Sequence, residues 1–278
     1  MKIRIIPDVH GHDWWKNLVE DIEELNYCIF LGDYLDDWTI PTPEIISNLE
    51  NIIEFKKSYM DKVVLLYGNH EWNYLSPYIG YCSGFRYSAF VDAERLLLEN
   101  KNLFQVCKLI NISLPLYSFP TQKLLFSHAG FSKDWIKDNY YWLNEKDYNS
   151  IEEDKWSKFK DFKLEDLEEK VNFGVDSHTI LDRIMQIGYK RGGVSPCGGP
   201  LWADFQEMFN KYLIGFRQFV GHTPMRDLAT KTSIYKERYP ETSSITFCDC
   251  GSREIKITLA STDKNLILIS NDQNTVLC

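Results

Sequence analysis

The sequence lacks any hydrophobic run of the ~18 residues that a membrane-crossing helix needs, so we expect no membrane segment. Its opening residues, Met1–Ile6, include a lysine and an arginine and are too short and too charged for a signal peptide. Its seven cysteines follow no regular framework, which argues against a secreted disulfide scaffold. These absences predict a cytoplasmic protein.

Positive charge is also scarce. The chain carries 31 Lys and Arg residues against 40 Asp and Glu, a formal net charge of -9. An acidic protein is a poor electrostatic match to a nucleic-acid backbone or an anionic membrane, so we expect neither long nucleic acid nor a membrane as a partner. A phosphorylated substrate remains compatible with this charge, because bound metal ions would reverse the sign of the local field.

Apolar runs alternate with helical patterns in the first part of the chain. Strands are predicted at Ile3–Ile6, Tyr27–Leu31 and Val63–Tyr67, and helices at Asp13–Leu25 and Pro43–Tyr59. This alternation indicates βαβ units and a largely parallel sheet. Ligand-binding groups in such sheets lie beyond the carboxyl ends of the strands.

The middle of the chain is less regular. A helix is predicted at Phe90–Leu98, and strands at Asn111–Leu116, Lys123–Ser127 and Phe216–Val220. Residues 132–200 are helix-rich, charged and aromatic, which favours an insertion or cap over the site. Its aromatic residues either stack on a base or peptide ring or pack the cap; they are Trp135, Tyr140, Tyr141, Trp142 and Trp156.

Three strand-like runs close the chain. They lie at Ser243–Cys248, Glu254–Leu259 and Asn265–Ser270, and they predict a second, more antiparallel sheet. The polar residues that carry the chemistry extend from Asp8 to His222. We therefore expect one domain over residues 1–278.

Five short polar motifs each follow an apolar run. They are Asp8-Val9-His10-Gly11, Gly32-Asp33-Tyr34-Leu35-Asp36, Gly68-Asn69-His70-Glu71, His128-Ala129-Gly130 and Gly221-His222-Thr223-Pro224. Asp, Asn and His side chains without Cys are ligands of hard-to-borderline divalent metals. The sequence thus predicts a metal site at the strand ends.

This ordered set resembles the calcineurin-like metallophosphoesterases, in particular the serine/threonine protein phosphatase branch and its bacterial and phage relatives. The family pattern reads GDxHG, GDxxDRG, GNHE, a His-Gly/Ala-Gly motif and a late Gly-His, and it spans residues 8–224 here. The resemblance implies an α/β fold, a four-layer αββα sandwich of two mixed sheets flanked by helices. It also implies an enzyme that hydrolyses a phosphate monoester by attack of a metal-bound hydroxide.

The same resemblance implies a role for each motif residue. A first metal would be held by Asp8 and His10, Asp33 would bridge two metals, and the second would be completed by Asn69, His128 and His222. The family habit favours two Mn²⁺ ions, with iron, zinc and nickel as alternatives. One anionic bridge keeps two dications close, and neutral ligands leave net positive charge for a phosphate.

By the same resemblance, His70 would protonate the leaving group. It would act as the general acid, and Asp36 would pair with it and raise the pKa of the imidazole. The chain holds six histidines, and four of them fall in the motifs, a coincidence that isolated surface or core histidines do not explain. His12 and His178 have no motif role, although His12 could touch the substrate because it lies two residues beyond His10 in the same loop.

The chain departs from the family pattern where the substrate would bind. Pro7 replaces the Gly before the first Asp, and Asp37, followed by Trp38, replaces the Arg of GDxxDRG, which helps to hold the phosphate in protein phosphatases. Arg191 and Arg86 are candidate substitutes, because a guanidinium can bind two phosphate oxygens at once.

The substrate therefore remains open at this stage. A phosphoprotein, a dinucleoside polyphosphate or another small phosphorylated molecule fits a monoesterase, while the loss of the Arg leaves room for a phosphodiesterase acting on a nucleic-acid end or a cyclic nucleotide. A non-catalytic metal-binding scaffold is a third interpretation. Leu201-Trp202-Ala203-Asp204 resembles the family's Trp-x-Asp stretch and predicts either a groove wall or a core Trp. The sequence predicts no particular oligomeric state.

Overall fold

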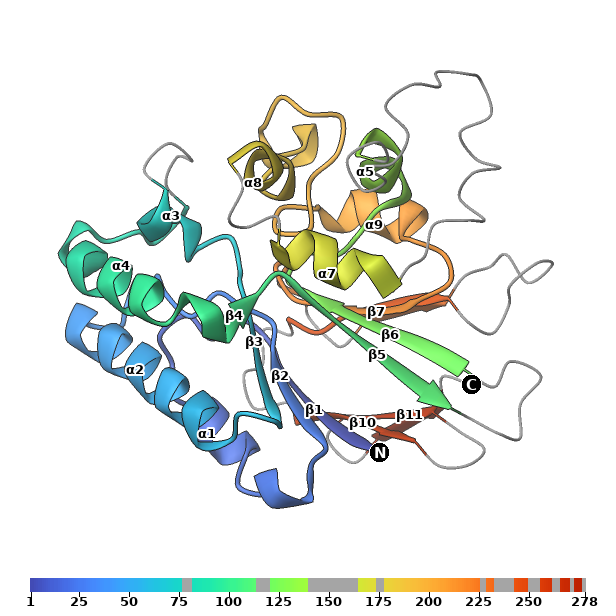
Figure 1. The fold of residues 1–278 in the computed structure, drawn as a ribbon, viewed down its shortest axis with the longest axis horizontal. Coiled ribbons are helices and arrows are strands. Elements are labelled where there is room, and N and C mark those ends of the chain that lie inside the picture. Colours follow the sequence, from blue (N-terminus) through green and yellow to red (C-terminus); the bar gives the residue numbers. More distant parts are fainter. Residues whose placement is uncertain are drawn as a thin grey trace.

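The computed structural model describes residues 1–76, 82–113, 121–139, 165–173, 178–225, 229–232, 243–249, 256–261, 266–270 and 273–276. In this part of the chain two mixed β-sheets lie face to face, and helices cover the outer face of each sheet (Figure 1). The four-layer α/β architecture predicted from the sequence is therefore confirmed.

The first sheet has the strand order β12-β11-β10-β1-β2-β3-β4. Strands β1 to β4 run parallel to one another, and β10, β11 and β12 are added antiparallel beyond β1. The bounds are β1 (Lys2–Ile6), β2 (Tyr27–Phe30), β3 (Val63–Leu66), β4 (Phe104–Gln105), β10 (Ile257–Ser261), β11 (Leu266–Ser270) and β12 (Gln273–Val276).

The second sheet has the order β5-β6-β7-β9-β8. Its three central strands β6, β7 and β9 are parallel, and β5 and β8 pair antiparallel at the two edges. The bounds are β5 (Cys107–Ser113), β6 (Thr121–Ser127), β7 (Arg217–Val220), β8 (Ala229–Thr232) and β9 (Ser244–Phe247).

Burial on both faces explains the continuous apolar runs of β2 and β3. Ile3 and Ile5 of β1 belong to the core between the sheets, which also holds the stacked rings of Phe126 and Phe219, with centroids 5.2 Å apart. Ile6 instead belongs to the core under the helices. The parallel strands are thereby held rigidly, which fixes the positions of the loops that follow them.

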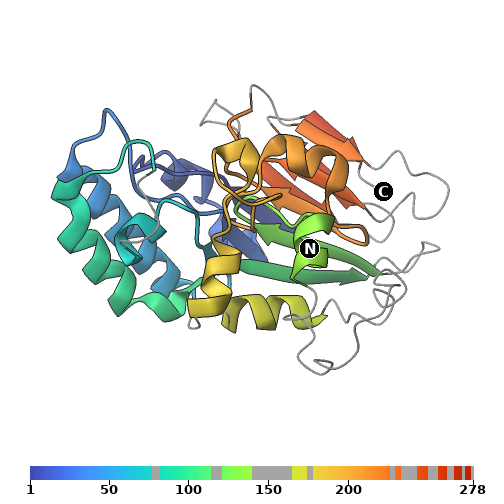
Figure 2. The same ribbon diagram turned by 90° about the horizontal axis from the view of Figure 1, so that it is seen from above.

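The helices that cover the first sheet lie apart from those that cover the second in both views (Figures 1 and 2). The first sheet is covered by α1 (Trp15–Leu18), α2 (Thr42–Ser58) and α4 (Phe90–Glu99), with α3 (Trp72–Leu75) at its edge; the second is covered by α5 (Lys133–Asp138), α7 (Glu165–Phe173), α8 (His178–Ile184) and α9 (Phe205–Lys211). In the part of the chain that the structure describes, 3₁₀ turns lie at Ile22–Glu24, Tyr87–Ala89, Lys101–Leu103 and Tyr189–Arg191. Among the described residues, no helix has the length and apolar character that a membrane crossing requires.

The predicted helix at Asp13–Leu25 is wrong in length. The structure has only α1 and the short 3₁₀ turn in this region. The buried Arg4 guanidinium donates to the Leu18 carbonyl and, at 2.9 Å, to the Asp21 carboxylate. Because a side chain from β1 takes the Leu18 carbonyl, the helical hydrogen-bond ladder stops there.

The predicted grouping of the three C-terminal strands is also wrong. Only β9 joins the second sheet, and it does so parallel to β7, whereas β10 and β11 extend the first sheet. Ile257 and Leu259 of β10 lie opposite Ile5 and Ile3 of β1 and are buried in the core between the sheets. Alternating burial identifies a strand but does not say which sheet it joins, so the error has a physical origin.

The described part of the predicted insertion at 132–200 forms the outer layer over the second sheet. Helix α7 lies against β5, where Asn172 accepts from the Cys107 N–H at 3.1 Å and Glu168 pairs with Lys108 at 2.8 Å. Trp135 is fully buried, which favours the packing interpretation for this ring. The other aromatic residues of the predicted group lie outside the described residues.

Candidate metal centre and active site

The predicted metal ligands all follow strands of the two sheets. Asp8, Asp33 and Asn69 come after the parallel neighbours β1, β2 and β3, while His128 and His222 come after the parallel neighbours β6 and β7. Parallel neighbours end at the same edge of a sheet, so both sheets present their polar residues on one side. There Asp8, Asp33, Asn69 and His222 line a cleft of about 390 Å³, to which His10, Asp36 and His70 also contribute. His128 is fully buried behind this lining.

The backbone at this cleft is strained. Four non-glycine residues of the described chain have positive φ, and all four are predicted site residues: His10 (46°), Asp33 (51°), Asp36 (65°) and His222 (63°). Such conformations cost on the order of 1 kcal/mol each and cluster at functional sites. The Asp33 carbonyl holds this loop by accepting the N–H groups of Val9 at 3.0 Å and His10 at 2.7 Å.

Two glycines let the carboxylates approach the neighbouring loops. A Cβ on Gly68 would collide with Oδ1 of Asp33, and a Cβ on Gly221 would collide with Oδ1 of Asp8. The Asp8 carboxylate also accepts the His222 N–H at 2.9 Å, which ties the first sheet to the second. The glycines of these motifs are therefore needed to bring the ligands together.

Asp33 lies at the centre of the group. One candidate ligand set joins it to His10 and His70, and another joins it to His128 and His222, with all ligand atoms of a set within 4.8 Å of one another. Its Oδ2 is 3.4 Å from Nε2 of His128 and 3.8 Å from Nε2 of His10. A carboxylate shared by two sets has the geometry of a bridging ligand.

The second set is completed by an amide. The Asn69 Oδ1 and the Nδ1 of His222 lie 2.8 Å and 3.0 Å from the same atom, Nε2 of His128. The Nδ1 of His128 faces the Leu31 carbonyl at 2.9 Å, so this nitrogen carries the proton and Nε2 presents a lone pair. Three electron-pair donors thus converge on one point, as a metal ion requires.

The protonation states suit a cation. Burial opposes the charge on Asp33, but the surrounding imidazoles of His128, His70, His10 and His222 lower the pKa of Asp33 well below its usual range. Burial lowers the pKa of His128 and, more strongly, that of His222. The lowered pKa of the Asp33 carboxyl favours its ionised form, and the lowered pKa values of His128 and His222 favour their neutral forms, which are the forms that bind metal.

The predicted acid and its partner are in contact. His70 Nδ1 lies 2.9 Å from Oδ2 of Asp36. The same oxygen accepts a hydrogen bond from the Asn73 side-chain amide at 3.2 Å, and Oδ1 of Asp36 accepts one from the Tyr74 hydroxyl. Burial opposes the imidazolium, but Asp33 and Asp36 together raise the pKa of His70 to about 9. Its Nε2 lies 3.8 Å from Asp33 Oδ2 and has a proton to give at neutral pH.

Glu71 has a structural role that sequence reasoning did not assign. Its fully buried carboxylate accepts three main-chain N–H groups, from Asp33 at 3.1 Å, Tyr34 at 2.8 Å and Gly68 at 2.8 Å. These bonds join the loops after β2 and β3, which carry Asp33 and Asn69. The signal was present in the sequence, because a Glu directly follows His70 in the motif.

We expect Glu71→Gln to lower the free energy of unfolding by about 2–4 kcal/mol, because the amide group replaces an acceptor among buried donors. Chemical denaturation of the metal-free protein measures this effect. Glu50→Gln, the same change at an exposed position of α2, is the matched control and should leave stability within about 0.5 kcal/mol. Equal stabilities for the two variants would contradict the role of Glu71.

The two candidate phosphate-binding arginines are placed differently. Arg191 lines the cleft, where its Nη2 donates to Thr223 Oγ1 at 2.7 Å and its Nε lies 2.9 Å from Asp204 Oδ2. Arg86 donates from Nε and Nη2 to the main-chain carbonyl of Asp37, at 3.0 and 2.7 Å, and supports that loop. Arg191 is therefore the better placed to contact a substrate.

Three further residues line the cleft. Trp202 forms part of the wall, with its ring centroid 5.8 Å from that of His222, in line with the groove-wall interpretation. Asp249 follows β9 as the other acidic groups follow their strands, and after burial its charge is the main cause that raises the pKa of Asp8. Cys82 accepts the Asn69 side-chain N–H at 3.1 Å and so helps to orient the amide.

Sequence reasoning missed both Asp249 and Cys82. Asp249 stands after an apolar run and before Cys250-Gly251, the same local context as the five motifs, so its signal was available. Cys82 has no comparable signal, because its approach to Asn69 depends on the path of the chain beyond α3.

Solved structures of similar shape include two phosphatases. A protein serine/threonine phosphatase from Saccharomyces cerevisiae with similarity to human phosphatase PP5 shares 15% identity, with 97% of this chain and 79% of that chain covered at a TM-score of 0.47. A dimetal phosphatase from Danio rerio shares 10% identity, with 100% and 98% covered at a TM-score of 0.45.

Sequence comparison is more informative. The chain is 28% identical over 141 residues to the serine/threonine-protein phosphatase 4 catalytic subunit of Kluyveromyces lactis, and the match covers 49% of this chain but only 41% of that protein. The family model of the calcineurin-like phosphoesterases matches residues 1–226, a span that contains every predicted metal ligand. With that match over most of its 278 residues, this chain belongs to the calcineurin-like phosphoesterase family of metal-dependent phosphate-ester hydrolases.

Proposed function

We propose that this protein is a phosphatase that uses two divalent metal ions to hydrolyse phosphate monoesters. The observation that carries the proposal is the position of Asp33, whose carboxylate belongs to both candidate ligand sets. Asp8, His10 and Asp33 would hold one ion, and Asp33, Asn69, His128 and His222 the other. The nitrogen and oxygen ligands favour Mn²⁺.

The residues of the cleft divide the reaction between them. Bound dications would polarise the phosphoryl group and activate water near neutral pH. His70 gives its Nε2 proton to the leaving-group oxygen, while Asp36 holds Nδ1 and fixes the ring. Arg191 binds a phosphate oxygen, and Trp202 closes one side of the cleft. A phosphoprotein, a dinucleoside polyphosphate and other small phosphorylated molecules are the candidate substrates, and the cytoplasm is the proposed location.

Metal dependence provides the first test. We expect chelation to abolish hydrolysis of phenyl phosphate and added Mn²⁺ to restore it, with saturation near two equivalents per chain. The melting temperature should rise in parallel, since an ion that binds only the folded chain stabilises it. Full activity after complete metal removal would contradict the proposal.

The pH dependence tests the acid. A general acid works only while protonated, so kcat/KM should fall as pH rises through the pKa of His70. That pKa is raised to about 9 with the help of Asp36, and Asp36→Asn should therefore move the alkaline limb to lower pH. Asp61→Asn, the same change at an exposed residue, should leave the limb in place. An unmoved limb in Asp36→Asn would exclude this pair as the acid.

A phosphodiesterase is the second candidate. It is favoured by Asp37, which stands where the family pattern has a phosphate-binding Arg and so supplies no positive charge for a monoester. This carboxylate accepts the N–H and hydroxyl of Thr39, both at 2.7 Å, and pairs with His12 at 3.2 Å, so it organises its own loop. Among the described residues that line the cleft, Arg191 is the one Lys or Arg. A diester carries less charge than a monoester and needs fewer cations. p-Nitrophenyl phosphate and bis(p-nitrophenyl) phosphate, which share one leaving group, separate the two candidates when assayed side by side.

A further inference from the structure

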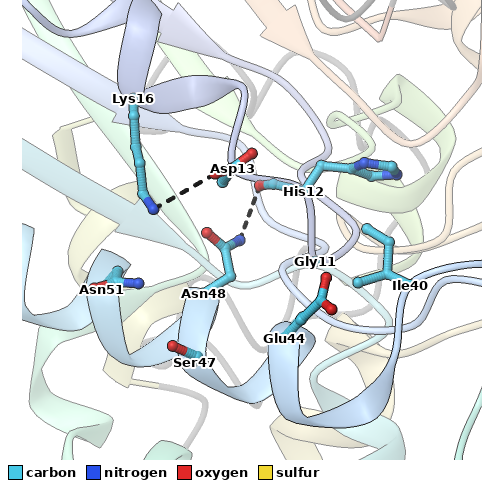
Figure 3. Close-up of a pocket in the computed structure, with 9 residues that line it drawn as sticks. All are labelled: Gly11, His12, Asp13, Lys16, Ile40, Glu44, Ser47, Asn48 and Asn51. Atoms are coloured by element: carbon cyan, nitrogen blue, oxygen red, sulfur yellow. Dashed lines mark hydrogen bonds and ion pairs between the residues drawn. The ribbon is translucent and has the colours of Figure 1, made fainter.

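A second hollow lies beside the metal cleft. It has a volume of about 380 Å³ and opens between residues 11–16 and one face of α2 (Figure 3). Gly11 and His12 line it, whereas His10, the residue before them, lines the metal cleft. The two spaces therefore lie on either side of one loop.

One pair of side chains connects the two linings. The His12 ring points away from Lys16 and Asn51 (Figure 3), and its Nε2 lies 3.2 Å from Oδ2 of Asp37, which lines the cleft. The His12–Asp37 pair therefore links the lining of the hollow to the lining of the cleft. Two spaces adjoining in this way suit a ligand whose phosphate lies in the cleft and whose remainder lies in the hollow.

Hydrogen-bond donors and acceptors line the hollow, and they include positively and negatively charged groups. Glu44, Ser47, Asn48 and Asn51 lie at spacings of three and four on α2, so they share one helical face. Asp13 from the loop and Lys16 from α1 face them, with Nζ of Lys16 and Oδ2 of Asp13 3.7 Å apart. Two carboxylates against one ammonium disfavour a second phosphate at this place.

The floor of the hollow is held in position. Asn48 is only 4% exposed, its Oδ1 accepts the Trp15 indole N–H at 3.0 Å, and its Nδ2 donates to the His12 carbonyl at 2.9 Å. The amide orientation is therefore set by the protein before any ligand arrives. Fixed polar groups of this kind favour specific recognition over loose hydration.

We propose that this hollow binds the neutral, hydroxyl-rich part of the ester, a sugar or other polyol, after its phosphate has entered the metal cleft. Each hydroxyl both donates and accepts, which matches carboxylates, carboxamides, a hydroxyl and an ammonium on one surface. In the described lining of the hollow, an aryl or alkyl group would find only one large apolar side chain, that of Ile40. The inference rests on the proposed phosphatase activity and narrows its substrate class to polyol phosphates.

Two variants of α2 test the inference. Glu44→Gln removes a charged acceptor, and Ser47→Leu places an apolar side chain in the hollow; both positions are exposed and outside the catalytic machinery. We expect either change to lower kcat/KM for ribose 5-phosphate about tenfold and that for phenyl phosphate less than about twofold. Glu54→Gln and Ser58→Leu, the same changes further along the exposed side of α2, should affect neither substrate.

Binding can also be followed without turnover. In NMR titrations with free ribose, the side-chain amide signals of Asn48 and Asn51 should shift in the wild type and stay in place in Ser47→Leu. Equal losses of kcat/KM for both esters, or side-chain amide signals that do not shift when ribose is added, would overturn the inference while leaving the phosphatase proposal intact. A wild type that binds ribose here but hydrolyses neither ester would instead overturn the phosphatase proposal.

Discussion

Replacing His70 with asparagine is expected to lower kcat for phenyl phosphate by roughly 10²–10⁴-fold, the usual contribution of a positioned general acid. The pKa of this imidazole is raised to about 9, with Asp36 2.9 Å away, so the wild-type ring carries its proton at neutral pH. Asparagine can bond to Asp36 but cannot give a proton to a leaving alkoxide. Steady-state kinetics of the manganese-loaded protein measures the loss.

The leaving group supplies an internal control for this variant. p-Nitrophenolate leaves readily without a proton, so His70→Asn should lose much less activity on p-nitrophenyl phosphate than on phenyl phosphate. The metal content should stay at the wild-type level, because Asp33 and the other predicted ligands are untouched. Equal losses on both esters, or loss of metal, would show that His70 acts through the metal centre and not as the acid.

Replacing Asp33 with asparagine is expected to have a still larger effect. The carboxylate is 2% exposed and is shared by both candidate ligand sets, so its loss removes the one anion that would hold two cations together. We expect activity on every ester to fall by roughly a thousandfold or more, because several kcal/mol of charge stabilisation are lost. At least one ion per chain should be lost as well, which elemental analysis of the purified variant would show.

Asp61→Asn is the matched control for Asp33→Asn, since it neutralises an exposed carboxylate outside the cleft. It should keep the activity and the metal content of the wild type. An Asp33→Asn variant with two bound ions and ordinary turnover would be incompatible with a bridging aspartate.

The sequence predicted the parallel core well, because burial on both faces leaves a strong local pattern. The runs at β2 and β3 are apolar throughout, and that at β1 is apolar apart from Lys2 and Arg4; the polar residue that follows each run marks where the chain leaves the core. The stripe of apolar residues on α2 likewise follows from packing on one side only. Both patterns depend only on residues that are close together in the sequence.

The incorrect predictions concern features that depend on residues far apart in the sequence. Arg4 ends α1 by taking the Leu18 carbonyl, and nothing near Leu18 in the sequence announces this contact. β10 joins the first sheet because Ile257 and Leu259 pair with β1, more than 250 residues away. Local periodicity carries no information about such contacts.

Anomalous diffraction from crystals soaked in Mn²⁺ tests the central claim most directly. Two peaks roughly 3.5–4 Å apart are expected, one on each side of the Asp33 carboxylate, with His128 and His222 on one peak and His10 on the other. A single peak, or peaks away from Asp33, would contradict the account.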